Sequence, residues 1–221
     1  MRTATPDAPP AEGDPRSPLH ALMGALLAVA YPAIVYVALT RLGPRAAGLS
    51  LAALVVPRAA LSLRGARRED VAHALRVPLT VGALALASAA WRDGRFLLAL
   101  PTLVNLSLLA HFASSLRTAT PLVERFARMQ VFELSDDERA WCRKVTAAWC
   151  VFFAANAATA AALALAAPPA WWALYTGALS YVAVGAMFTA EYVLRSNRFR
   201  RYGTTLPDRI MARLLPPRGA A

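Results

Sequence analysis

The sequence predicts an all-α membrane protein, a bundle of about six transmembrane helices with both termini in the cytoplasm. Composition is the first observation behind this: hydrophobic residues make up 57% of the 221-residue chain, charged residues 17%, and mean hydropathy is +0.42. The second is that the apolar residues gather in six long stretches. Most reach the roughly 20 residues that a helix needs to cross the hydrocarbon core of a bilayer. In hydrocarbon the backbone must satisfy its own hydrogen bonds, so we expect helices throughout.

The six predicted spans follow one another along the chain. They cover Leu19–Thr40, Ala46–Leu63, Ala72–Trp91, Phe96–Leu116, Val145–Ala167 and Trp171–Leu194. Residues 1–18 contain many Pro and Ala together with acidic residues, and we expect them to form a disordered tail. Residues 195–221 are expected to form a basic cytoplasmic tail. Pro101 lies inside the fourth span, where a kink is tolerated because neighbouring helices can satisfy the freed backbone groups.

The positions of the basic residues predict the topology. Nineteen of the 24 lie in or beside the N-terminal tail, the second connection, the fourth connection and the C-terminal tail. The other three connections together carry only Arg41, Arg45, Arg92 and Arg95. Cytoplasmic segments are enriched in Lys and Arg, so both termini are expected inside, with an even number of spans. The same distribution argues against nucleic-acid binding despite the formal charge of +11, because the charges flank apolar runs.

The longest connection, residues 117–144, is predicted to be a cytoplasmic element with its own structure. Leu122, Phe126 and Met129 fall on one face of a short helix that we expect to lie in the membrane interface. Ser135 and Glu138 form a capping box, which should begin a long helix that continues into the fifth span.

The fifth span contains a run of alanines and a buried amide. Its alanines recur every four residues and are expected to form a smooth surface for a neighbouring helix; they are Ala154, Ala158, Ala162 and Ala166. Asn156 lies near the middle of this span, and Asn105 lies near the middle of the fourth. Consecutive spans are antiparallel, so the two amides share a depth. We expect a hydrogen bond between the helices here, with a ligand contact as the alternative.

Ionisable side chains inside the membrane are costly, so each is a candidate for a function. Four share a depth near the cytoplasmic side and are candidates for a polar cup that opens inward: Arg58, Arg76, His111 and Glu191. The alternative is that the arginines extend their head groups to the interface and Glu191 pairs with a nearby arginine.

No motif in the chain indicates an enzyme. Paired acid and base groups, a phosphate-binding glycine loop and histidines at metal-ligand spacing are not found, so we expect no catalytic, cofactor-binding or metal-binding residue. Cys142 and Cys150 are eight residues apart on one predicted helix. That places them about 12 Å apart along its axis, too far for a disulfide.

Several stretches resemble a known family. Pro121-Leu-Val-Glu-Arg125, followed by Trp141, Ala148-Trp149, Phe152-Phe153 and Asn156, resembles the septation protein A (intracellular septation) family of bacterial inner-membrane proteins. Asn105–Phe112, the same Pro121–Arg125 stretch and Glu191–Arg195 are similar to multi-pass proteins encoded among genes for aryl polyene or xanthomonadin-type pigment synthesis. The resemblance covers roughly residues 90–203. It implies a location in the bacterial inner membrane and supplies no catalytic residue.

These observations together favour a non-enzymatic scaffold or partner in cell-envelope or aryl polyene (lipid-linked pigment) biogenesis. Its partners would be the lipid bilayer and, on the cytoplasmic side, anionic lipid headgroups, an acidic acyl carrier protein or cytoplasmic acyl-chain enzymes. The candidate contact residues for these partners are Arg125, Arg128, Arg139, Arg143, Arg198, Arg200 and Arg201. The alternative is a small transporter or flippase for a lipid or aryl polyene intermediate, which would use the cup around His111 and Glu191.

Overall fold

The computed structural model describes residues 18–63, 68–130, 134–200 and 206–214, and side chains within these ranges except 18–25, 27–28, 58–63, 68–77 and 130. The described ranges contain helices and no strand, which confirms the predicted all-α class. The elements are α1 (Pro18–Leu63), α2 (Arg68–Trp91), α3 (Arg95–Leu98), α4 (Leu100–Ser115), α5 (Leu122–Gln130), α6 (Asp136–Ala166), α7 (Pro169–Leu174), the π-helix η1 (Tyr175–Leu179), α8 (Ser180–Phe199) and α9 (Leu206–Leu214). The predicted tail at residues 1–18 lies almost entirely outside the described residues.

Four stretches of the described chain are long and apolar enough to cross a membrane, which supports a membrane protein. They are Val29–Pro57, Arg95–Ser115, Asp136–Ala166 and Pro169–Phe199. A shorter apolar helix covers Pro78–Trp91. Their surfaces are largely exposed apolar side chains, as expected for helices whose solvent is lipid.

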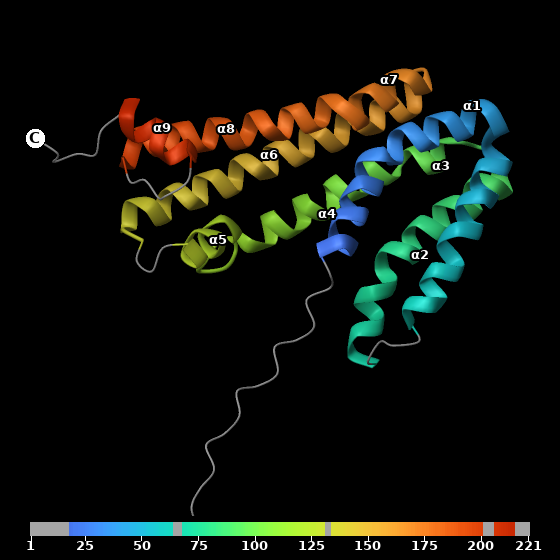
Figure 1. The fold of residues 1–221 in the computed structure, drawn as a ribbon, viewed down its shortest axis with the longest axis horizontal. Coiled ribbons are helices and arrows are strands. Elements are labelled where there is room, and N and C mark those ends of the chain that lie inside the picture. The colour runs from blue at the N-terminus through green and yellow to red at the C-terminus, as the bar shows by residue number, and fades with distance from the viewer. Residues whose placement is uncertain (1–17, 64–67, 131–133, 201–205, 215–221) are drawn as a thin grey trace, which may run out of the picture.

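The first of these stretches is bent. Gly43 has φ 77° and ψ 168°, values outside the helical region that only glycine adopts without strain, and Pro44 follows it. Helix α1 therefore consists of two arms, residues 18–42 and 44–63. Figure 1 shows the second arm returning beside α2, so that the two form a hairpin that makes a wide angle with the long helices α6 and α8.

The hairpin packs through small residues. A Cβ added at Gly48 would lie 2.4 Å from the carbonyl oxygen of Ala85 and 2.9 Å from the nitrogen of Ala89, so the two backbones are nearly in contact. The hydroxyl of Ser88 donates to the carbonyl oxygen of Pro44 across the same interface (3.2 Å). Close approach of this kind is how membrane helices gain packing energy where lipid supplies no hydrophobic drive.

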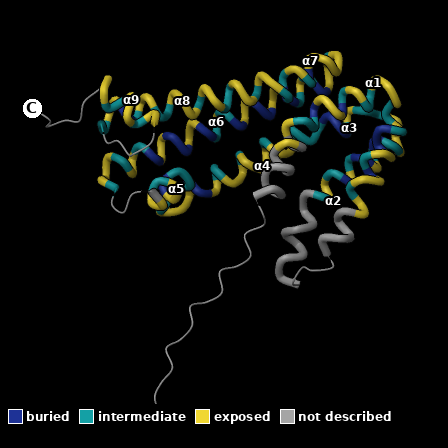
Figure 2. Tube along the Cα trace, viewed as in Figure 1, coloured by how far each residue is buried: buried dark blue, intermediate teal, exposed yellow. Residues whose placement is uncertain are grey.

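The larger part of the molecule is a bundle in which α6 packs against both α4 and α8. Figure 2 shows a buried stripe running along α6. Its centre is aromatic: the ring of Trp149 lies 4.8 Å from that of Phe188 on α8, and Phe153 lies 5.1 Å from Phe112 on α4, centroid to centroid. Aromatic pairs at such distances add about 0.5–1.5 kcal/mol each beyond area burial.

The prediction that an alanine surface would pack against a neighbouring helix is wrong in its register. Ala154, Ala158, Ala162 and Ala166 are all exposed. The buried alanines are instead Ala157, Ala160 and Ala164. The rotation of α6 is set by the large and polar side chains on its buried stripe, Trp149, Phe153 and Asn156, and the alanines that continue that stripe are the ones covered.

The predicted short helix and capping box are both present. Helix α5 covers the predicted segment, with Phe126 and Met129 exposed on one face. At the start of α6 the backbone N–H of Ser135 donates to the Glu138 carboxylate (2.8 Å), and the backbone N–H of Glu138 donates to the Ser135 hydroxyl (3.3 Å). Figure 1 places α5 at one end of the bundle, where it is viewed nearly end-on while α6 and α8 run across the picture. Helix α9 lies at the same end and was not predicted.

Three connections meet at the opposite end of the bundle. A shallow pocket is lined by Leu39 and Pro44 from the bend of α1, by the α2–α3 turn and by the α6–α7 turn. The residues contributed by the two turns are Asp93, Gly94, Arg95, Ala167 and Pro169. These are the three connections in which the sequence has few basic residues.

Candidate functional site

The two intramembrane amides are hydrogen-bonded to each other. The Asn156 side chain donates from Nδ2 to Oδ1 of Asn105 (3.0 Å), which confirms the predicted bond between the two helices. Asn105 in turn donates to the carbonyl oxygen of Pro101 on its own helix (2.8 Å). The Tyr175 hydroxyl donates to Oδ1 of Asn156. Three elements, α4, α6 and η1, are therefore joined by one polar network.

A second set of hydrogen bonds satisfies backbone carbonyl groups where α3 ends and α4 begins. Pro101 has no N–H, so the carbonyl oxygen of Leu97 loses the donor that a regular helix would provide. The hydroxyl of Tyr31 on α1 donates to that oxygen (2.7 Å). The indole nitrogen of the fully buried Trp172 donates to the carbonyl oxygen of Leu98 (3.1 Å). Neighbouring side chains thus satisfy the backbone groups freed near Pro101, as the sequence predicted, although the helix is interrupted at Ala99.

Tyr31, Trp172 and Tyr175 were missed as partners of these polar groups. Each is an aromatic residue with a polar atom inside an apolar run, and such residues usually find a hydrogen-bond partner when buried. The sequence already indicated that the asparagines and the backbone near Pro101 need hydrogen-bond partners. Matching them with the polar aromatic residues of other spans would have predicted these bonds. The network occupies the middle of the helices and binds them together.

The polar cup is not assembled by the described contacts. The side chains of Arg58 and Arg76 lie outside the described residues. His111 is exposed, and its Nδ1 lies 3.2 Å from the carbonyl oxygen of Ser107 on its own helix. Glu191 accepts from Nε of Arg195 one turn away (3.0 Å), which is the alternative expected for it. His111 belongs to α4 and Glu191 to α8, and these two helices lie on different sides of α6 (Figure 1).

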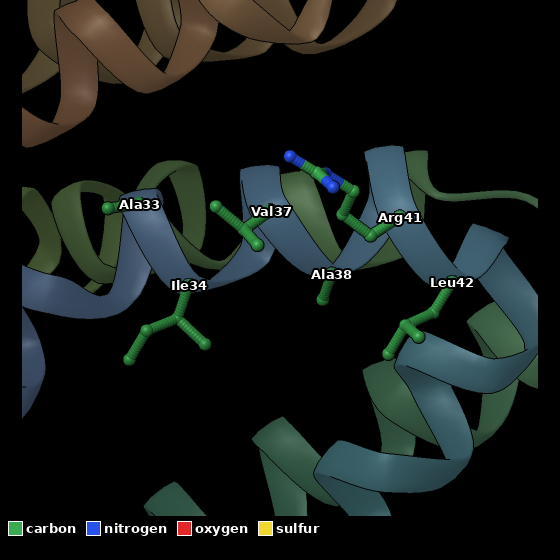
Figure 3. A pocket seen from close by; sticks show the side chains of 6 residues that line it. All are labelled: Ala33, Ile34, Val37, Ala38, Arg41 and Leu42. Carbon is green, nitrogen blue, oxygen red and sulfur yellow. The ribbon is translucent and has the colours of Figure 1, made fainter.

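An open apolar groove runs along the end of the first arm of α1. Figure 3 shows its lining, Ala33, Ile34, Val37, Ala38, Arg41 and Leu42. Arg41 is its one charged residue and stands near the bend. The groove belongs to the exposed apolar surface of the membrane helices.

The end of the bundle that carries α5 is held by arginine. Arg143 of α6 donates from Nη1 to the carbonyl oxygen of Leu116 (2.7 Å) and from Nη2 to that of Thr118 (3.1 Å). Arg125 of α5 donates from Nε to the carbonyl oxygen of Thr120 (3.0 Å). Carbonyl groups at the end of α4 have no helical donor, so Arg143 supplies donors to two of them. Arg125 adds a second donor to the carbonyl of Thr120, which also accepts from the Thr118 hydroxyl.

The residues of the Pro121–Arg125 motif have structural roles in the same turn. The Ser115 hydroxyl accepts from the backbone N–H of Leu122 (3.1 Å) and Pro121 is fully buried. Glu124 is buried and accepts from Arg128 through two donors, at 2.7 and 3.0 Å. The clamp formed by Ser115, Pro121, Arg125 and Arg143, termed here the arginine clamp, explains why these residue types occur together.

Basic residues of α6 and α8 lie at the same end of the bundle as the arginine clamp. The guanidinium of Arg198 lies 5.8 Å from the centre of the Trp141 ring, which itself contacts Phe199 edge to face at 6.2 Å. Arg139 pairs with the fully exposed Asp136 at 3.4 Å. Arg200 ends α8 in the left-handed conformation, and Arg201 lies outside the described residues.

In the part of the chain that the structure describes, no group of three or more His, Cys, Asp and Glu side chains could hold a metal ion. Both cysteines are free thiols, as their spacing predicted.

Comparison with known proteins identifies no relative. No protein-family model, no curated protein and no solved structure matches this chain. The resemblance to septation protein A and to the pigment-cluster proteins therefore stays a prediction.

Proposed function

We propose that this chain is a six-span protein of the bacterial inner membrane, with both termini in the cytoplasm. In this proposal it has no enzymatic activity of its own. It serves as a membrane partner for an acidic acyl carrier protein or the acyl-chain enzymes that use one, in cell-envelope or aryl polyene biogenesis.

The topology draws support from the two ends of the molecule. The bend of α1, the α2–α3 turn and the α6–α7 turn gather at one end. The arginine clamp and α9 lie at the other, where basic residues are concentrated. The arms of α1 on either side of Gly43 would be about 37 Å and about 30 Å long as helices, so each is long enough to span by itself. For the second arm to span the membrane, the hairpin must also turn until it runs parallel to α6. The bend at Gly43 is the point at which the chain can make that turn.

The docking proposal rests mainly on one contact, that of Arg198 with Trp141. It holds an exposed guanidinium from the end of α8 against the first turns of α6, the part of that helix where the exposed Arg139 also lies. A rigid basic surface made from two helices is suited to an acidic partner, because positive and negative potentials steer association and fix register. Arg128 already binds Glu124, and Arg143 already donates to backbone carbonyl groups. These two arginines would therefore attract an acidic partner by their charge and not by hydrogen bonds to it.

Charge reversal tests this proposal. The protein is placed in nanodiscs of zwitterionic lipid, so that lipid charge does not compete, and titrated with purified holo acyl carrier protein. The double variant Arg139→Glu with Arg198→Glu should bind at least about tenfold more weakly, a loss of about 1.4 kcal/mol. The matched control, Arg92→Glu with Arg95→Glu at the opposite end, should bind as the parent does.

Equal binding of the parent, the double variant and the control would contradict the docking proposal. In that case the basic residues serve topology and lipid contact alone.

A further inference from the structure

Helices α5 and α9 share a sequence pattern. Each has nine residues, and each places Leu first, a carboxylate third, Arg fourth and a large apolar side chain fifth. In α5 these residues are Leu122, Glu124, Arg125 and Phe126. In α9 they are Leu206, Asp208, Arg209 and Ile210.

The carboxylate of each helix faces the protein. Glu124 is buried and bound by Arg128. Asp208 accepts a hydrogen bond from the hydroxyl of Tyr192 on α8 (2.7 Å), which ties α9 to the end of that span. With one face fixed in this way, the remaining faces of both helices point outward.

The outward face of α9 is apolar at its centre and basic at its edge. Leu206, Ile210 and Leu214 are 74%, 55% and 70% exposed, and one helical turn separates each from the next. At 100° per residue, Arg209 and Arg213 fall beside this stripe. In α5 the matching exposed residues are Phe126 and Met129, with Arg125 at the edge.

The position of the two helices along the bundle sets their depth. Helix α6 and the Pro169–Phe199 stretch each have 31 residues, about 46 Å of helix, which exceeds a hydrocarbon core of roughly 30 Å. Helix α5 precedes the first of these and α9 follows the second, at the same end (Figure 1). Both therefore lie at headgroup level, where an apolar stripe can enter the acyl region while arginines contact lipid phosphate.

We propose that α5 and α9 are a pair of interfacial anchors, and that the occupant of their exposed apolar faces is the surface of an anionic phospholipid bilayer. Charge complementarity favours this occupant over another protein, because each apolar stripe is flanked by arginine. The end of α8 to which Tyr192 ties α9 also exposes the apolar side chains of Val193 and Leu194. This inference does not depend on the docking of an acyl carrier protein.

The test measures the depth of residue 210 relative to the bilayer. Full-length protein with Cys142→Ala and Cys150→Ala receives a fluorophore at Ile210→Cys and is reconstituted into vesicles of phosphatidylcholine with or without phosphatidylglycerol. In the vesicles with phosphatidylglycerol, nitroxide-labelled lipid should quench the fluorophore strongly, and aqueous iodide should quench it severalfold less than in vesicles without it. A fluorophore at Asp137→Cys, an exposed position at the same end, should respond to iodide alone in both vesicle types.

A second variant guards against a local effect of the label. Adding Arg209→Gln and Arg213→Gln should reduce the protection given by phosphatidylglycerol, and a label at Phe126→Cys should behave as that at Ile210 does. Equal iodide quenching in both vesicle types would overturn the inference. Protection that arises only when the ratio of protein to lipid is raised would overturn it too, because it would assign the face to a second copy of the chain.

Discussion

The α1–α2 hairpin and the α4–α6–α8 bundle pack helices in lipid by different means. The hairpin relies on small residues: Gly48 lets the backbones nearly touch, and Ser88 adds one hydrogen bond. The bundle relies on aromatic rings around Trp149 and on the amide network of Asn105 and Asn156. A close backbone contact fails when one methyl group is added, whereas a network of side chains can lose one member and keep the others. The hairpin should therefore be the more sensitive region to a single small substitution.

The largest effect is expected at Gly48. Gly48→Ala places a Cβ 2.4 Å from a backbone oxygen, so the helices must separate, at a cost of about 1–3 kcal/mol in the free energy of unfolding. Gly82→Ala is the control, because a Cβ there meets nothing within 4 Å. Unfolding of both variants by denaturing detergent in mixed micelles gives the comparison. Equal stabilities would show that the close approach contributes nothing.

The next effect is expected at Asn156. Asn156→Leu removes the bonds to Asn105 and to Tyr175 and should destabilise the bundle by about 1–2 kcal/mol. Thr159→Val, which removes only an exposed bond to its own helix, should change much less. In a double-mutant cycle of Asn105→Ala with Asn156→Ala, strict additivity of the two losses in unfolding free energy would show that the two side chains do not stabilise each other, which contradicts the network.

The arginine clamp provides a smaller effect that is local. Arg143→Gln removes charged donors from the carbonyl oxygens of Leu116 and Thr118 and should raise hydrogen exchange at the backbone amide of Leu122, about fivefold for a loss of about 1 kcal/mol. Lys144→Gln, one residue along the same helix, is the matched control. If both variants exchange at the parent rate, the clamp does not order the turn.

The smallest effect is expected at the start of α6. Ser135→Ala removes the capping box and should cost about 0.5–1 kcal/mol, whereas Ser135→Asn, which keeps a good N-cap, should stay close to the parent. Thermal unfolding in detergent measures both. An alanine variant as stable as the asparagine variant would contradict a role for the cap.

The sequence could predict features that depend on local pattern. Helical class, the capping box, the helix at residues 122–130 and the bond between Asn105 and Asn156 all follow from periodicity or from the cost of burying a polar group. The register of α6 could not be predicted, because alanines occur on several faces of this helix. Its rotation is decided by how its own Trp149 and Phe153 pack against rings of the neighbouring helices α8 and α4. Helix α9 was missed because it has only nine residues and three of them are charged.

The candidate site was predicted less completely. The asparagines were found, but their partner Tyr175 and the donors Tyr31 and Trp172 depend on contacts across 19 to 74 residues of chain. The basic residues were read as a docking surface. Two of them have structural roles instead: Arg128 binds the buried Glu124 carboxylate, and Arg143 donates to the carbonyl oxygen of Leu116. These partners come close only when the chain is folded.

The number of spans decides the whole account, and one labelling experiment tests it. In a background with Cys142→Ala and Cys150→Ala, single cysteines replace Arg45 at the bend of α1, Asp93 at the α2–α3 turn and Ser135 at the start of α6. Six spans with cytoplasmic termini predict that a membrane-impermeant maleimide reaches positions 45 and 93 from outside in intact cells whose outer membrane is permeabilised, and reaches position 135 only after lysis. If position 45 is not labelled from either side while position 93 is, Val29–Pro57 crosses as a single span and the six-span account is contradicted.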